Sequence, residues 1–413
     1  MSATTAAGPG PLQRHGKIGL VPVRYGAGLV GGAEIVLAEM ARGLQQRGWD
    51  VEILTTCALD HYTWRNELPA GARDEDGLTV RRFPVVVDDI PEHGTLEHSI
   101  MSGAKVPIQA QQRWMNSGMR TPELYHHIVD HAEDYRALIF SPYPSWVTFA
   151  CSQISPSRSV LWTCLHDEPY AYLDLFSPVF TGVAGLLFQT APEHELAHRI
   201  IDPLAPHAEV GCGVGVPQDY DPDGFRARHG IDGPFLLYAG RREGGKGWEE
   251  LLSNFAGALG RSDLEFSLVT MGRGPVNPPA AVAGRVVDLG FLDDAERDNA
   301  FAAASAYIQP SRYEAFSRTI MEAWLANTPV IANGACDVVA WHCERSGAGL
   351  TYDDGFEFEA CLSFLAEAPD AAAALAAPGR GYVLSNYTWD GVLDRVESAL
   401  AGWTRAPQVA VAP

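Results

Sequence analysis

Two glutamates, Glu314 and Glu322, stand eight residues apart in the segment PSRYEAFSRTIMEAW. If a helix begins near Ser317, Glu314 lies in the loop before it, and the unpaired amides of Phe316, Ser317 and Arg318 form an anion site. Glu322 then lies inside the helix, where a carboxylate can accept hydrogen bonds from a ribose diol. Glu314 would repel phosphates, so sugar hydroxyls suit it better. The alternative is that the glutamates cap the helix or carry surface charge.

A basic loop, GRREGGKG at residues 240–247, follows the strand-like run 235–239 and precedes a helical pattern. Arg241 offers a planar fork of donors and Lys246 a flexible point charge, and both suit a diphosphate. A solvated basic turn explains the same stretch equally well.

A glycine-rich loop, GAGLVGG at residues 26–32, formally contains GxGxxG before a helix. A nicotinamide site fits poorly, because several residues separate strand and glycines and the next strand ends in Thr55 and Thr56 instead of an acid. Gly31 and Gly32 are better interpreted as letting backbone approach a sugar phosphate. A simple tight turn remains the alternative.

Histidines add a weaker signal. His166 follows a strand-like run, a position that is more often structural when taken alone. His127 and His131 are four residues apart on a predicted helix, but no third ligand is evident, and a solvated helix face is favoured. Asp293 and Asp294 precede an amphipathic helix and are interpreted as its cap. The sequence therefore predicts no catalytic metal.

The elements that would position these residues are strands and helices in alternation, which is typical of α/β folds with parallel sheets. Residues 37, 40, 41 and 44 are apolar at helical spacing. Strand-like runs lie at 18–21, 51–55, 137–140, 160–164 and 185–189, and again at 235–239, 266–271, 286–289, 306–309 and 330–332. Helices are expected at 248–259 and 317–326.

The chain has 413 residues, which favours two domains. Glycine-rich residues 211–217 between the two series of strands suggest a hinge. We expect domains at 1–212 and 213–385, with a helix and tail at 386–413 that cross back to the first domain. The terminal segments 2–10 and 406–413 are expected to be frayed tails.

Charge and composition narrow the class of protein. The formal charge is −21, from 30 basic and 51 acidic residues, which disfavours nucleic acid and anionic lipid as partners. No signal peptide and no integral membrane segment are evident, and the seven cysteines show no CxxC spacing. These features predict a cytoplasmic protein with reduced thiols. The sequence indicates no particular oligomeric state.

Several ordered motifs together carry a resemblance to a known family. The pattern from Glu314 to Glu322 resembles the E-x7-E signature of the GT-B fold retaining glycosyltransferases, family four (glycosyl transferases group 1). The loop GRREGGKG is similar to that family's G-R-x4-K-G. Further matches are GGAE at 31–34, GRGP at 272–275, the strand ending in Pro-Ser at 306–311, and TPVIA at 328–332. The matches spread over about residues 17–352.

The resemblance implies two Rossmann-like, doubly wound parallel-sheet domains facing a cleft. It implies retaining transfer of a hexose from a UDP- or GDP-sugar to a hydroxyl of a sugar, glycan or small-molecule acceptor, giving an α-glycosidic bond. Neither a metal nor another cofactor is expected. The same-fold alternative is a nucleotide-sugar epimerase or hydrolase, and the alternative from another class is a non-catalytic nucleotide-sugar binder.

The resemblance also implies roles for individual residues. Arg241 and Lys246 would hold the donor diphosphate, and Glu322 would bind the ribose. Glu314 and the amides after it would hold the sugar and the phosphates, and His166 would contact the sugar. The family usually has glycine where Ser317 stands and a small or apolar residue at Arg318. This departure implies that Arg318 would add a phosphate contact or would alter the preferred donor.

Overall fold

The computed structural model describes residues 15–26 and 31–404. The chain divides into two compact units. Within the described residues, the first comprises 15–26, 31–188, 194–210 and 393–404, and the second comprises 189–193 and 211–392. The chain leaves the first unit after residue 210 and returns to it after residue 392. The expected domain boundaries, after residues 212 and 385, lie near these points and stay a prediction. The hinge at 211–217 also stays a prediction.

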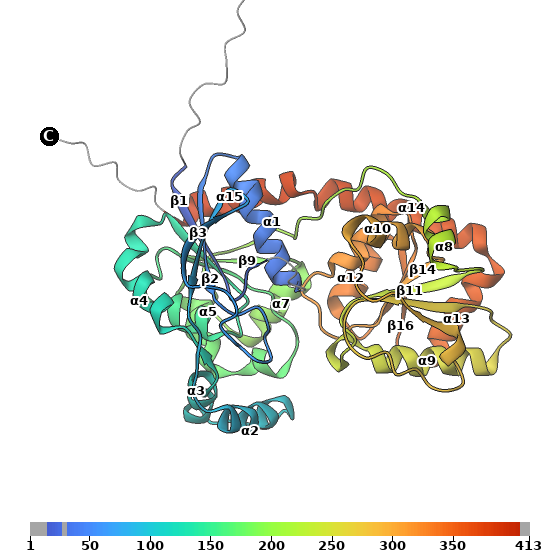
Figure 1. The fold of residues 1–413 in the computed structure, drawn as a ribbon, viewed down its shortest axis with the longest axis horizontal. Coiled ribbons are helices and arrows are strands. Elements are labelled where there is room, and N and C mark those ends of the chain that lie inside the picture. Colours follow the sequence, from blue (N-terminus) through green and yellow to red (C-terminus); the bar gives the residue numbers. More distant parts are fainter. Residues whose placement is uncertain (1–14, 27–30, 405–413) are drawn as a thin grey trace, which may run out of the picture. The chain divides into compact units, whose positions relative to one another are not determined.

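The first unit is built on an eight-stranded sheet in the order β10-β9-β8-β7-β1-β2-β4-β3 (Figure 1). All neighbouring strands are parallel except β3 and β4, which form an antiparallel edge. The strands are β1 Lys17–Pro22, β2 Asp50–Thr56, β3 Gly71–Glu75, β4 Leu78–Phe83, β7 Ala137–Ser141, β8 Ser159–Trp162, β9 Gly185–Phe188 and β10 His207–Glu209; β5 Val86–Val87 and β6 Met119–Arg120 form a separate small ribbon.

Helices cover this first sheet, and apolar stripes explain why they do. In α1, Leu37, Met40, Ala41 and Leu44 are all buried, which confirms the predicted helical stripe. The helices are α1 Gly32–Gln46, α2 Ile90–Met101, α3 Ile108–Ser117, α4 Pro122–His131, α5 Trp146–Cys151, α6 Ser177–Gly182 and α7 Ala191–Ile200, with 3₁₀ turns at Ala132–Asp134, Pro169–Tyr172 and Asp174–Phe176.

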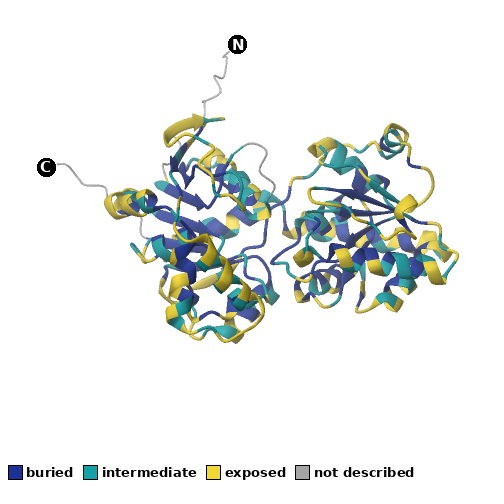
Figure 2. Cartoon of the chain, turned by 60° about the horizontal axis from the view of Figure 1, so that its bottom comes forward, coloured by how far each residue is buried: buried dark blue, intermediate teal, exposed yellow. Residues whose placement is uncertain are grey.

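The second unit is a six-stranded, wholly parallel sheet in the order β13-β12-β11-β14-β15-β16. Its strands are β11 Phe235–Ala239, β12 Ser267–Met271, β13 Val286–Asp288, β14 Ala306–Gln309, β15 Val330–Asn333 and β16 Gly349–Tyr352. Its helices are α8 Pro222–His229, α9 Trp248–Arg261, α10 Asp294–Ala303, α11 Arg318–Leu325, α12 Asp337–Ser346, α13 Gly355–Glu367 and α14 Pro369–Asn386, with 3₁₀ turns at Gly244–Lys246 and Ala283–Arg285. Figure 2 shows most strands of the two sheets in the buried interior of each unit, whereas the edge strand β3 is exposed.

Both sheets confirm the predicted α/β, doubly wound class. Each has the Rossmann-like arrangement in which strand order reverses beside the first strand, between β1 and β7 and between β11 and β14. The antiparallel strand β3 was not anticipated, because its sequence, GARDE, is polar and exposed and carries no apolar signal. Asp293 caps α10 as predicted, accepting a hydrogen bond from the Glu296 amide at 2.9 Å.

The last helix, α15 Trp389–Trp403, passes from the second unit into the first. Its later part bonds to the first unit: Arg47 contacts Asp394 at 2.6 Å and Glu397 at 2.8 Å, and the Trp49 indole donates to Glu397 at 2.6 Å. None of the seven cysteines forms a disulfide, and six of them are buried. Within the described ranges, no single helix meets the length and hydropathy of a membrane span, although the bent pair α13 and α14 does so when taken together.

Candidate functional site

The reversal of strand order in the second unit brings two loops together. The loop after β11 holds residues 240–247 and the loop after β14 holds residues 310–317, and these two strands pair directly. Gly247 has φ of +69°, and a Cβ there would clash with the Pro310 carbonyl oxygen. Only glycine permits this close approach. In doubly wound sheets, ligands bind outside the carboxyl ends of the strands at such a point.

An ion pair connects these two loops. Lys246 Nζ lies 2.8 Å from Glu314 Oε1, and the side chains are 27% and 13% exposed. The glutamate charge is therefore balanced within the site. Because an ammonium group has three donors, Lys246 can keep this bond and still donate to an anionic ligand. The structure brings together two residues that the sequence analysis selected separately.

The two adjacent arginines of the loop after β11 have different surroundings. Arg241 is 36% exposed, and its guanidinium lies 3.0 Å from Glu243. Arg242 is buried, donates to the Gly272 carbonyl at 2.8 Å and forms an ion pair with Asp288. Arg242 therefore stabilises the packing of neighbouring loops, and Arg241 is the arginine of the two that a ligand can reach.

The start of α11 has an unusual backbone. Ser317 precedes the helix with φ of +70°, a left-handed conformation in which glycine has no steric cost. Its hydroxyl does not cap the helix but accepts a hydrogen bond from Gln309 Nε2 at 2.6 Å. Gln309 was missed by the sequence analysis, although a polar amide ending an apolar strand was a usable signal. Gln309 positions the helix start whose amides were predicted to bind an anion.

Phe316 anchors the same loop through its buried side chain. Its ring makes edge contacts with His342 and Tyr387, at centroid distances of 5.2 and 4.9 Å. Burial lowers the pKa of His342 to about 3, so this imidazole is neutral near pH 7. Its Nδ1 lies 2.9 Å from the Tyr382 hydroxyl. Phe316 can therefore offer a ligand its backbone but little of its ring.

Glu322 lies on α11, and its side chain is largely buried. Its Oε2 lies 3.9 Å from Arg297 Nε, and Arg297 also pairs with Asp294 at 2.7 Å and Asp298 at 3.1 Å. Arg297 is a neighbour that the sequence analysis did not select. Arg318 opens α11 and is half-buried. Glu322 and Arg318, which were both predicted to bind the donor, therefore lie on the helix that follows the loop with Glu314.

The first unit also places a charged pair where its strand order reverses. Arg24, just after β1, donates to Glu34 through Nε at 3.1 Å and Nη2 at 2.5 Å, and to the Leu59 carbonyl at 2.9 Å. Glu34 folds back over Gly31, where a Cβ would clash with its carboxylate, whereas a Cβ at Gly32 would meet nothing within 4 Å. Residues 27–30 of the glycine-rich loop lie outside the described residues.

His166 lies beyond the end of β8 in the first unit. Its Nδ1 is 3.5 Å from Glu168 Oε1, and the Tyr143 hydroxyl donates to the same carboxylate oxygen at 3.2 Å. Burial raises the pKa of Tyr143 well above its ordinary value, so the phenol stays protonated and remains a donor. The contact with Glu168, which Tyr143 holds in place, orients the His166 imidazole. His166, Gly31 and Gly32 belong to the first unit, and the other predicted site residues belong to the second: Arg241, Lys246, Glu314, Phe316, Ser317, Arg318 and Glu322.

His127 and His131 on α4, interpreted from the sequence as part of a solvated helix face, each have a polar neighbour. His127 Nε2 lies 3.4 Å from the Tyr135 hydroxyl, and His131 Nδ1 lies 3.1 Å from Asp134. Among the described residues, the cluster able to hold a metal is a different one, made of His194, His198 and His207, which the sequence analysis did not select.

Comparison with known proteins agrees with this architecture. Residues 233–367 match the family model for glycosyl transferases group 1. The chain is 30% identical over 175 residues to the 2-deoxystreptamine glucosyltransferase of Streptomyces kanamyceticus, covering 38% of this chain and 44% of that protein. It is 24% identical over 351 residues to the D-inositol 3-phosphate glycosyltransferase of Frankia alni, covering 74% and 78%. The chain thus spans less than half of the first relative.

Solved structures extend the likeness to nearly the whole chain. Sucrose-phosphate synthase from Thermosynechococcus elongatus has a TM-score of 0.67 at 16% identity, covering 94% of this chain and 98% of that one. HepE of Anabaena, in complex with UDP and glucose, also has a TM-score of 0.67, at 18% identity, covering 94% and 100%. These likenesses define a GT-B fold. Within that fold, the match to the glycosyl transferases group 1 model is confined to residues 233–367.

Proposed function

We propose that this protein is a glycosyltransferase that moves a hexose from a nucleotide sugar, UDP- or GDP-linked, to a hydroxyl of a sugar, glycan or small-molecule acceptor. Transfer proceeds with retention and gives an α-glycosidic bond. The observation that carries the proposal is the Lys246–Glu314 pair, which joins the loops after β11 and β14 inside the region that matches the group 1 model. HepE, whose structures hold UDP with glucose and UDP-glucose, supports a UDP-linked donor.

The donor diphosphate is held by cations and helix amides in this proposal. Lys246 keeps its bond to Glu314 and donates its remaining N–H groups to a phosphate oxygen, and Arg241 adds a planar fork. Amides of Phe316, Ser317 and Arg318 at the start of α11 add partial positive charge. These groups stabilise the negative charge that develops on the leaving diphosphate, which is the role a metal would otherwise fill.

Glu314, Glu322 and His166 hold the sugar and the nucleoside. With its charge balanced by Lys246, Glu314 accepts hydrogen bonds from donor-sugar hydroxyls without repelling the phosphates. Glu322 accepts from the ribose diol, and His166, oriented by Glu168, donates to the sugar. The proposal places the reaction in the cytoplasm, where cysteines that form no disulfide stay reduced.

A donor-binding screen tests the proposal. Thermal shifts with UDP-, GDP- and ADP-sugars in EDTA are compared for wild type, Lys246→Ala and Lys105→Ala, a lysine on the exposed surface of the first unit. We expect one donor class to stabilise wild type and Lys105→Ala but not Lys246→Ala. No shift with any donor at millimolar concentration would contradict the assigned function.

Product analysis separates the remaining candidates. Incubation of the stabilising donor with an acceptor library should release the nucleoside diphosphate and form an α-linked product. Donor consumption without any acceptor would instead indicate an epimerase or hydrolase of the same fold, and binding without turnover would indicate a nucleotide-sugar binder. An inverted, β-linked product would contradict the retaining mechanism.

A further inference from the structure

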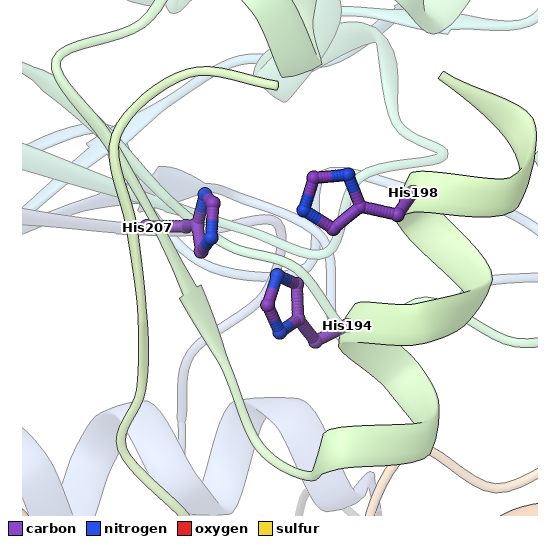
Figure 3. A group of neighbouring side chains, drawn as sticks. All are labelled: His194, His198 and His207. Atoms are coloured by element: carbon purple, nitrogen blue, oxygen red, sulfur yellow. The ribbon is translucent and has the colours of Figure 1, made fainter. Parts of the chain in front are cut away.

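Three histidines in the first unit converge on one point (Figure 3). His194 and His198 project from successive turns of α7, and His207 projects toward them from the edge strand β10. Their candidate ligand nitrogens all lie within 4.8 Å of one another, and ring centroids are 4.4 to 5.3 Å apart. The cluster thus combines a local helical spacing with a residue from another element.

Hydrogen bonds fix which nitrogen two of these rings present. His194 Nδ1 lies 2.9 Å from Glu209 Oε1, and His207 Nδ1 lies 3.1 Å from the Ala205 carbonyl oxygen. Both oxygens can only accept, so each Nδ1 carries the proton and each Nε2 keeps its lone pair. Among the described residues, the buried Nε2 of His194 has no hydrogen-bond partner. A buried polar atom in this state requires an explanation, and a bound cation is one.

The surroundings suit a metal centre with an open coordination position. Phe188 is fully buried and stacks on His194 at a centroid distance of 5.0 Å, so it forms an apolar floor. His198 and His207 are exposed, which leaves room for water as a fourth ligand. Glu209 bonding to the second nitrogen of His194 has the carboxylate–histidine arrangement that orients metal ligands.

We propose that His194, His198 and His207 bind one divalent transition metal ion, Zn²⁺, with Glu209 positioning His194. His194 and His207 bind through Nε2, and His198 binds through one of its ring nitrogens. Neutral imidazoles are borderline ligands that suit Zn²⁺ better than Mg²⁺ or Ca²⁺, which prefer oxygen. Zn–N bonds of about 2.0–2.1 Å place tetrahedral ligand atoms roughly 3.3 Å apart, so small side-chain rotations close the site. The chain's charge of −21 attracts cations in general.

The ion would join α7 to β10. These elements are connected by residues 201–206, and β10 is an edge strand held by β9 on one side. Because the unfolded chain lacks the assembled cluster, binding stabilises the folded first unit. None of the three histidines is among the residues proposed to bind the donor. Of those residues, Gly31, Gly32 and His166 lie in the first unit and all others lie in the second.

The chain supplies a matched control for metal binding. His127 and His131 on α4 have the same four-residue spacing as His194 and His198, and their ring centroids are 4.6 Å apart. No third ligand joins them among the described residues. A helical histidine pair alone binds weakly, so substitution of His131 should leave the tight site intact.

A competition titration with a chromophoric chelator tests the site on tag-free, EDTA-stripped protein. Wild type and His131→Ala should each bind one Zn²⁺ per chain. His194→Ala and His207→Ala should lose affinity by at least about 100-fold, and Glu209→Gln by about 10- to 100-fold because only the orienting bond is lost. If wild type binds no more Zn²⁺ than His194→Ala and His207→Ala, the proposal is wrong.

A spectroscopic arm keeps the test independent of folding defects and of glycosyl transfer. Co²⁺ added to wild type should give the visible absorption of a low-coordinate cobalt site, and Zn²⁺ should displace it. Zn²⁺ should also raise the melting temperature of wild type and His131→Ala but not of His207→Gln, whose side chain remains polar and exposed. A Zn²⁺-induced shift of equal size in His207→Gln would overturn the assignment.

Discussion

The two units place oppositely charged pairs at equivalent points of similar sheets, and the pairs differ in how accessible they are. In the first unit Arg24 and Glu34 are 11% and 14% exposed, and Arg24 is bound to Glu34 and to the Leu59 carbonyl. In the second unit Lys246 is 27% exposed, with Arg241 beside it in the same loop. The topology decides where a ligand can bind, and the side chains decide whether a cation there can reach it.

The choice of cation contributes to this difference. An arginine fork bound by a carboxylate through two nitrogens has a rigid geometry, which suits a structural pair. A lysine with one carboxylate partner keeps donors for a second anion. We therefore expect substitutions at Lys246 and Arg241 to affect donor binding and turnover, and substitutions at Arg24 to affect stability.

The largest effect is expected for Lys246→Ala. Loss of a cation at the leaving group should reduce kcat by about 10²–10³, as for other groups that stabilise developing charge. Steady-state kinetics with the identified donor, beside Lys105→Ala, measure this effect. Activity within a few-fold of wild type would contradict the role of Lys246.

The next effect is expected for Arg24→Leu, which leaves the Glu34 carboxylate largely buried without its partner. We expect a loss of about 2–3 kcal/mol in the free energy of unfolding, below the range for fully buried pairs. Glu34→Leu and the double variant complete a double-mutant cycle in urea denaturation. If Arg24→Leu instead weakens donor binding as much as Lys246→Ala does, the contrast between the two units fails.

Low pH should reduce the folding stability of both units, and the reduction should extend to a lower pH in the second unit than in the first. Burial lowers the pKa of His342 to about 3 and of His127 to about 4, both from an ordinary value of 6.5. Below pH 6.5 the unfolded chain binds protons that the folded chain excludes. Stability therefore falls as pH decreases, by at most about 1.4 kcal/mol per pH unit for each group, until the folded pKa is reached.

Hydrogen exchange followed by mass spectrometry can resolve this pH dependence by unit. Peptides of β14 and β15 should report the second unit, and peptides of β1 and β2 the first. His342→Gln should flatten the acid dependence of the second unit only. An unchanged slope in that variant would show that His342 is not the titrating group.

The smallest effect concerns the backbone at Ser317. Ser317→Gly and Ser317→Ala both remove the hydroxyl bonded by Gln309, but only alanine keeps a Cβ at φ of +70°. Ser317→Ala should therefore be less stable than Ser317→Gly by about 1–2 kcal/mol in urea denaturation. Equal stabilities would mean that the left-handed conformation is not maintained in solution.

Much of the fold could be predicted from local sequence. The strands at 235–239 and 306–309 have the predicted bounds, and the other eight predicted strands agree within two residues. The GT-B fold and the group 1 match agree with the resemblance that the glutamate, glycine and basic-loop motifs carried. The strands β3, β4, β10 and β16 and the two-residue strands β5 and β6 were missed. β3, β10 and β16 lack a distinct apolar run, and in β4 two arginines interrupt it.

The sequence by itself determined the alternation of strands and helices and the residues of the basic loop, because apolar periodicity and glycine positions are local properties. Only the tertiary structure decided which side chains meet. Lys246 and Glu314 are 68 residues apart, and nothing in either segment specifies their pairing. His127–His131 and His194–His198 have identical spacing, and only the packing of β10 beside α7 supplies His207 to one of them. Such contacts depend on long-range packing and side-chain rotamers, which local patterns do not encode.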